Sequence, residues 1–249
     1  MLRTIWIMWL RELKKFSRSR SRIVAALGQP ILFLLALGYG LGSVFQAAGQ
    51  GSYLLFLAPG VIGMAIIFAS IFNGMQIIWD RRFGFLKETL VAPVSRVAIM
   101  LGRTFGGATV ATLQGCIVFA LTLGFGFHPH NWALVIPAIL VMFLMASLFS
   151  ALGITVASFV TDMQGFQLVM NFLVMPIFFL SGALFPLTNV PLLLRALATV
   201  DPLSYGVDGM RALLIDRSHF GIVTDVTVVF VIAIVLLGIG SYRFTKLEV

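Results

Sequence analysis

Uncharged polar side chains recur at helical spacing inside two long apolar runs of this sequence. The two sets are Ser70, Asn73 and Gln76, and Gln164, Gln167 and Asn171. Spacings of three and four residues place each set on one face of a helix. Because an amide inside a bilayer needs a hydrogen-bond partner, the two sets either join neighbouring helices or form a polar stripe along a substrate path. The two roles are compatible.

No group of residues in the sequence predicts a catalytic centre, and no Asp, Glu or His lies in the middle of an apolar run. An intramembrane hydrolase would need a nucleophile with a base, or two carboxylates, facing each other in the bilayer. An ion-coupled transporter usually carries embedded ionisable residues. His128 and His130 share a short turn, but two ligands are weak evidence for a metal site. We therefore predict no catalytic residue and no metal site.

The chain also lacks a phosphate-binding loop of the form G-x-x-x-x-G-K-[ST]. Without an ATP site or embedded ions, any transport by this chain needs energy from a separate subunit. We expect the chain to bind no cofactor and to be no enzyme itself.

A charged segment, residues 80–96, separates two of the apolar runs and reads DRRFGFLKETLVAPVSR. Phe83, Phe85, Leu86 and Leu90 alternate with charges, and Pro93 closes the pattern. This alternation predicts a short amphipathic helix whose apolar side enters a groove on a partner, with charges at the rim. The segment is the obvious place for an energising subunit to dock.

The composition identifies an integral membrane protein, with 60% hydrophobic and 10% charged residues in a chain of 249. We predict an all-α protein forming a single transmembrane domain over residues 1–249. Residues 1–22 form an interfacial helix with an apolar stripe that includes Trp6 and Trp9 and with cations opposite. Six spans follow, at residues 23–45, 53–79, 97–127, 132–160, 164–184 and 222–242. The net charge of +8 is explained by topology and anionic headgroups, so no nucleic-acid partner is expected.

The distribution of Lys and Arg predicts the orientation. Residues 1–22 carry seven of them, residues 80–103 carry five and the C-terminal tail carries two, which makes fourteen of the seventeen on one face. Both termini and the charged segment are therefore expected in the cytoplasm. On the outer side, residues 185–220 hold a Leu-rich stretch interrupted by prolines, which predicts two short re-entrant helices near 191–199 and 202–215.

Three stretches resemble the membrane subunit of type-2 ATP-binding cassette (ABC) exporters, especially the daunorubicin-resistance and nodulation-factor export branch. Residues 79–96, WDRRFGFLKETLVAPVSR, resemble the coupling segment of that family. Residues 176–186, PIFFLSGALFP, are similar to its fifth-span exit, and residues 201–209, DPLSYGVDG, to its outer-helix motif. With the basic N-terminal helix and the six spans, the resemblance covers nearly the whole chain.

The resemblance implies a homodimeric or pseudo-dimeric permease that binds two copies of a cytoplasmic ABC ATPase, which would hold ATP and Mg. It implies a multi-pass protein of a bacterial or archaeal cell (inner) membrane. The coupling residues would be Arg82, Phe83, Gly84, Phe85, Leu86, Lys87, Glu88, Thr89, Leu90 and Pro93. The substrate path would include Ser70, Asn73, Gln76, Gln167 and Asn171. The outer gate would include Pro186, Asp201, Pro202, Tyr205 and Asp208.

Family membership leaves the cargo open, because members move drugs, lipids and glycoconjugates. The 23 Phe residues and few embedded polar groups favour an amphipathic or lipid-like small molecule. Export of a glycolipid, lipo-oligosaccharide or polysaccharide by the same mechanism is the alternative within transport. A membrane scaffold that transports nothing is the alternative of a different class.

Overall fold

The computed structural model describes residues 1–48, 51–84 and 94–245, and every regular element in these ranges is a helix. The all-α prediction is therefore confirmed for this part of the chain. Five helical segments are long and apolar enough to cross a membrane. They are α4 (Tyr53–Arg82), α6 (Arg96–Gly124), Trp132–Phe159, α8 (Met163–Leu180) and α11 (Ile222–Thr245). The third comprises a short 3₁₀ turn, η2 (Trp132–Leu134), and α7 (Val135–Phe159).

The region predicted as the first span, residues 23–45, is divided among several elements. It contains α2 (Arg20–Phe33), a π-helical turn, η1 (Leu34–Tyr39), and α3 (Gly42–Ala47). Pro30 lies inside α2, and such a proline removes one helix hydrogen bond and favours a bend. The apolar helix there covers Leu27–Tyr39, which is shorter than the five long helices. A sixth span over this region stays a prediction.

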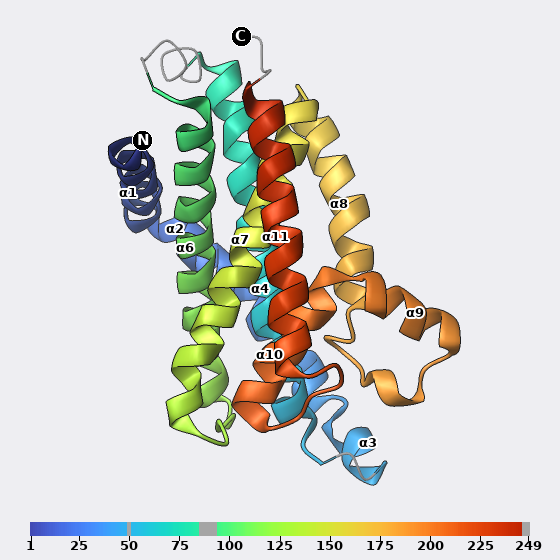
Figure 1. Cartoon of the computed structure of the whole chain (residues 1–249). Helices are drawn as coiled ribbons and strands as arrows, with labels where there is room; N and C mark the ends of the chain where they lie inside the picture. The colour runs from blue at the N-terminus through green and yellow to red at the C-terminus, as the bar shows by residue number, and fades with distance from the viewer. Residues whose placement is uncertain (49–50, 85–93, 246–249) are drawn as a thin grey trace.

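The long helix α4 lies at the centre of the bundle, packed against α6 and α7 (Figure 1). Its contact with α7 is the most extensive, and within it Gly74 and Gly153 face each other, so that a Cβ atom at Gly74 would lie 2.9 Å from the Gly153 Cα. Small residues allow helix backbones in a membrane to approach in this way. Helix α11 covers the other side of α7, and α1 (Leu2–Arg18) packs along α6.

Different helices and helix ends lie at the two ends of the bundle. At one end, the last turn of α4 meets the end of α7, where Arg81 donates to the Val160 carbonyl at 3.4 Å. The start of α6 meets the end of α11 there, through Arg96 and the Thr245 carbonyl at 2.8 Å. The opposite end carries α3 and the short helices α9 (Leu192–Val200) and α10 (Pro202–Ile215), as Figure 1 shows. A 3₁₀ turn, η3 (Leu187–Asn189), precedes α9.

Candidate coupling site

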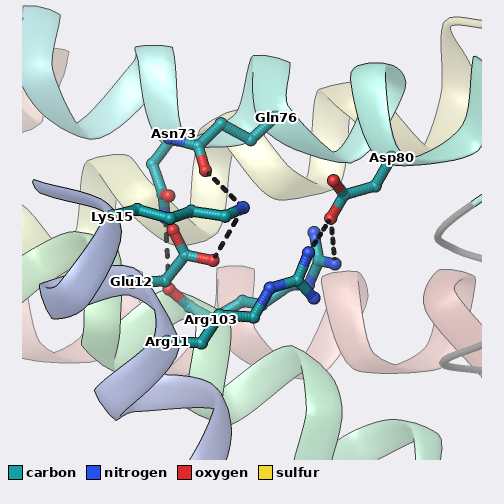
Figure 2. Close-up of polar contacts among 7 residues, drawn as sticks. All are labelled: Arg11, Glu12, Lys15, Asn73, Gln76, Asp80 and Arg103. Atoms are coloured by element: carbon teal, nitrogen blue, oxygen red, sulfur yellow. Dashed lines mark hydrogen bonds and ion pairs between the residues drawn. The ribbon is translucent and has the colours of Figure 1, made fainter. Parts of the chain in front are cut away.

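Seven polar residues from three helices gather where α4 approaches the charged segment. Figure 2 shows them together: Arg11, Glu12 and Lys15 from α1, Asn73, Gln76 and Asp80 from α4, and Arg103 from α6. We call this group the polar cluster. It holds three cations and two anions, so it carries a net charge of +1. The cluster joins α1, from the start of the chain, to α4 and α6.

An ion pair between buried side chains forms the centre of the polar cluster. The Asp80 carboxylate accepts from the Arg103 guanidinium, and these residues are 6% and 2% exposed. Arg11 donates to the same carboxylate oxygen at 3.2 Å and is partly exposed. Removing one partner of such a pair leaves a buried charge without compensation, which is far more costly than losing a surface pair. Asp80 therefore holds α1, α4 and α6 in one arrangement.

A second set of contacts extends the polar cluster toward the middle of α4. Lys15 donates to Gln76 Oε1 at 3.3 Å and lies 3.8 Å from the carboxylate of Glu12, which is buried. Burial lowers the pKa of Lys15, while the carboxylates of Glu12 and Asp80 oppose this shift. Asn73 donates to the Arg103 backbone carbonyl at 3.1 Å. The amides of α4 thus serve as interhelical hydrogen-bonding groups.

Glycines on α6 allow the other helices to come this close. A Cβ atom at Gly102 would lie 2.8 Å from the Ile5 carbonyl oxygen, and one at Gly106 would lie 2.9 Å from the Glu12 side chain. On another face, a Cβ atom at Gly107 would overlap the amide of Asn73. The sequence around residues 102–107 therefore lets α6 receive α1 on one side and α4 on the other.

The structure brings together some of the predicted path residues and separates the rest. Asn73 and Gln76 belong to the polar cluster, whereas Ser70 is fully buried nearby on α4 and its hydroxyl has no partner among the described residues. Gln167 and Asn171 lie on an exposed face of α8.

Of the predicted coupling residues, three lie in the described part of the chain. Arg82 is the last residue of α4 and is exposed. Phe83 stacks on Trp79 with ring centroids 5.4 Å apart, and Gly84 has a φ of 79°, which favours glycine. The others, Phe85, Leu86, Lys87, Glu88, Thr89, Leu90 and Pro93, lie outside the described residues. Asp80, at the end of the polar cluster, is thus two residues before Arg82, the first of the predicted coupling residues.

The predicted outer-gate residues gather around α10. Asp201 caps this helix by accepting from the Leu203 N–H at 2.8 Å, with Pro202 at the first helical position. Tyr205 donates to the Thr199 carbonyl at 2.7 Å. Asp208 accepts from the backbone N–H groups of residues 219 and 220, both at 2.8 Å. A cavity of about 360 Å³ lies beside Asp208 and includes Pro186 in its lining.

Asp201 provides a pH-dependent prediction, because it lies between α9 and α10, outside the long helices. Burial raises its pKa to about 7, although the Leu203 N–H opposes the shift. A carboxyl with a raised pKa favours the folded state below its unfolded pKa of 3.8, and this contribution is lost as pH rises through 7. Asp201→Asn keeps the capping oxygen but does not ionise. We expect its free energy of unfolding to rise by up to about 4 kcal/mol relative to that of wild type between pH 4 and pH 8.

Melting temperatures of both proteins across this pH range would test the expectation. Asp162→Asn is the matched control, since Asp162 caps α8 in the same way at an exposed position. A constant difference between Asp201→Asn and wild type from pH 4 to pH 8 would contradict it.

Sequence reasoning did not identify Arg11, Glu12, Asp80 and Arg103 as one site. The charge count uses Arg103 only to predict orientation, whereas the structure places it as a buried partner of Asp80, about two turns inside α6. Asp80 was expected to begin the charged segment, but α4 continues through Arg82. The available signal was an acid at the end of one span and a base inside the start of the next. Ionisable residues at such positions usually pair with each other.

Comparison with known proteins supports a role in transport. The family model described as ABC-2 type transporter matches residues 3–215. The chain is 29% identical to the inner membrane transport permease YadH of Escherichia coli K12, over 95% of each chain. It is 28% identical to nodulation protein J of Rhizobium leguminosarum bv. trifolii, over 84% of this chain and 81% of that protein. The match covers most of the sequence and both helices that flank the charged segment, and the chain belongs to the ABC-2 type transporter family.

Proposed function

We propose that this chain is the permease subunit of an ABC exporter that moves an amphipathic or hydrophobic small molecule, or a lipid-like cargo, out of the cytoplasm. A separate ATPase subunit supplies the energy and binds in two copies to a homodimer of this chain. Membership of a transporter family and the apolar interior of the bundle support this proposal. The ATPase, and not this chain, holds ATP and Mg.

The proposed topology has six spans, with residues 23–45 as the first. Both termini and the charged segment face the cytoplasm, which agrees with the excess of Lys and Arg in these regions. Helices α9 and α10 then lie at the outer face and re-enter the bilayer from it. Support comes from the fold, since α4 and α11 end at one end of the bundle and α9 and α10 lie at the other (Figure 1).

The ion pairs of Asp80 with Arg103 and Arg11 are the observation that carries the proposed mechanism. They connect α4 and α6, the helices on either side of the charged segment, and they attach α1 to both. When ATP closes the ATPase pair, force on the charged segment moves α1, α4 and α6 as a unit. Because α4 also packs closely on α7 at Gly74, this motion spreads through the bundle.

The exposed amides of α8 support the homodimer. Gln167 and Asn171 lie on a helix of which only 22% of the most apolar part is buried within one chain. Amides facing lipid lack hydrogen-bond partners, and a second copy of the chain would supply them. In such a dimer the amides line the path between the two permease halves.

Docking is testable with the partner ATPase co-expressed with the full chain. We expect Phe85→Ala and Glu88→Ala to reduce co-purification of the ATPase by roughly 10-fold or more, since buried aromatic and charged groups dominate small interfaces. Both variants should insert into the membrane at wild-type levels. Ile136→Ala serves as the control, because Ile136 is exposed near the start of α7, whereas the last turn of α4 meets the other end of that helix. Equal recovery of the ATPase with both variants and wild type would contradict the assignment of the docking segment.

A further inference from the structure

A cavity of about 360 Å³ lies between α2, α4 and α6, apart from the polar cluster and from the exposed amides of α8. Its volume falls in the range of small-molecule pockets, roughly 300–1,000 Å³. Most of its wall is apolar, and two glutamines are the exceptions. The lining consists of Leu27, Gln29 and Pro30 from α2, Met64, Ala65, Phe68, Ala69 and Phe72 from α4, and Gln114 and Val118 from α6.

Gln114 is the unusual member of this lining. Its side chain is only 4% exposed, yet it makes no hydrogen bond with any residue that the structure describes. The second glutamine, Gln29, is exposed and makes only a long contact with the Met64 sulfur, at 3.7 Å. The amide of Gln114 is not among the buried side-chain atoms that lack a partner, so it reaches the open space of the cavity, where a bound molecule can hydrogen-bond to it.

Water is a poor partner for Gln114 in this cavity. A buried water needs two to four polar contacts, and the lining offers only two amides on different helices. A ligand with a hydrocarbon part would cover the apolar wall, and one neutral polar group would satisfy Gln114. Because no lining residue is charged, a charged headgroup would have to stay outside.

The position of the cavity indicates how a ligand would enter. Ala65, Phe68, Ala69 and Phe72 follow one face of α4 at helical spacing, in the middle of this long helix. Phe72 is 48% exposed and Gln29 is also exposed, so the cavity opens beside them to the surface of the bundle. At this depth the surrounding medium is hydrocarbon, from which an amphiphile can enter sideways.

We propose that this cavity binds an amphiphile whose alkyl chain or ring lies against Phe68 and Val118 and whose neutral ester, amide or hydroxyl group bonds to Gln114. This chemistry is shared by a membrane lipid and by a hydrophobic cargo. The binding site itself does not depend on the ATPase or on export.

Photolabelling of the full chain in nanodiscs of ether-linked phosphatidylcholine tests the site. One probe is a diazirine-bearing dodecanoic acid methyl ester, and the second is a diazirine-bearing dodecane without a polar group. We expect both to label peptides of α2, α4 and α6. Gln114→Leu should reduce labelling by the ester roughly 3- to 10-fold, the value of one hydrogen bond, and leave labelling by the hydrocarbon unchanged.

Two further variants complete this experiment. Ala65→Phe should fill the cavity and reduce labelling by both probes, whereas Gln46→Leu, the same kind of change at an exposed position of α3, should affect neither. Gln114→Leu should melt no earlier than wild type, because the amide that it removes faces the cavity and makes no hydrogen bond with the described residues. Equal ester labelling of wild type and a folded Gln114→Leu would overturn the proposal, as would unchanged labelling of Ala65→Phe.

A second arm distinguishes the source of the ligand. Replacing the ether-linked lipid with an ester-linked one should displace the ester probe if a membrane lipid is the natural occupant. Adding the ATPase and ATP should deplete the bound probe if the occupant is cargo. A chain that binds no ATPase would refute the proposed function but would still show the Gln114-dependent labelling.

Discussion

Replacing Asp80 with alanine is expected to destabilise the protein by roughly 3–5 kcal/mol, the usual cost of removing one partner from a buried ion pair. Arg103 would keep its charge in a site that is 2% exposed and would lose its carboxylate. Arg11 would lose the same partner, so α1 would be held less firmly against α4. The fraction folded in a detergent denaturation series measures this loss.

Arg82→Ala is the matched control for Asp80→Ala, because it removes a charge two residues later on the same helix from an exposed side chain. Its effect should stay within about 0.5 kcal/mol. Equal stability of Asp80→Ala and Arg82→Ala would show that the ion pair contributes nothing to the fold.

Gly74→Leu is expected to produce the other large loss, about 3 kcal/mol or more. The first atom of the new side chain would lie 2.9 Å from the Gly153 Cα and closer still to its carbonyl group. These neighbours are backbone atoms, so they cannot move aside as a flexible side chain can. Helices α4 and α7 would have to separate along their most extensive contact. A lower melting temperature of the purified chain would report this.

The same substitution at Gly238 is an internal control. Gly238 lies within α11, and a Cβ atom there would meet nothing within 4 Å. Leucine also favours the helix over glycine by up to about 1 kcal/mol, so Gly238→Leu should melt no earlier than wild type. Similar melting temperatures of the two leucine variants would contradict the close packing of α4 on α7.

The sequence predicted the elements whose ends carry strong local signals. Helix α10 begins at Pro202 after the capping residue Asp201, and the proline pattern gave the preceding short helix to within a residue at each end. Apolar length alone identified the five long helices. Residues 23–45 are different, because the effect of Pro30 and of the nearby glycines on a helix depends on what packs around them.

Helical periodicity could not reveal the polar cluster, because it does not show which neighbour a face meets. The apolar stripe of α1 suggested a helix lying on lipid with Arg11 and Lys15 turned away. In the structure Leu2 and Trp6 are exposed, while Glu12 is buried against α6. The sequence shows that Asn73 and Gln76 are amides in need of hydrogen-bond partners. Only the packing of the three helices shows that these partners are the Arg103 carbonyl and Lys15.

We propose that the polar cluster carries motion from the ATPase to the outer end of the bundle. A cysteine in place of Ser204, which is buried beside Asp208 and Arg211 at that end, reports such motion in a Cys116→Ser background without other cysteines. Maleimide labelling of the reconstituted complex with its ATPase should change when ATP is added. Asp80→Asn should abolish this change while the folded complex still hydrolyses ATP, and Asp162→Asn should preserve it. An ATP-dependent change of wild-type size in the Asp80→Asn complex would contradict the claim.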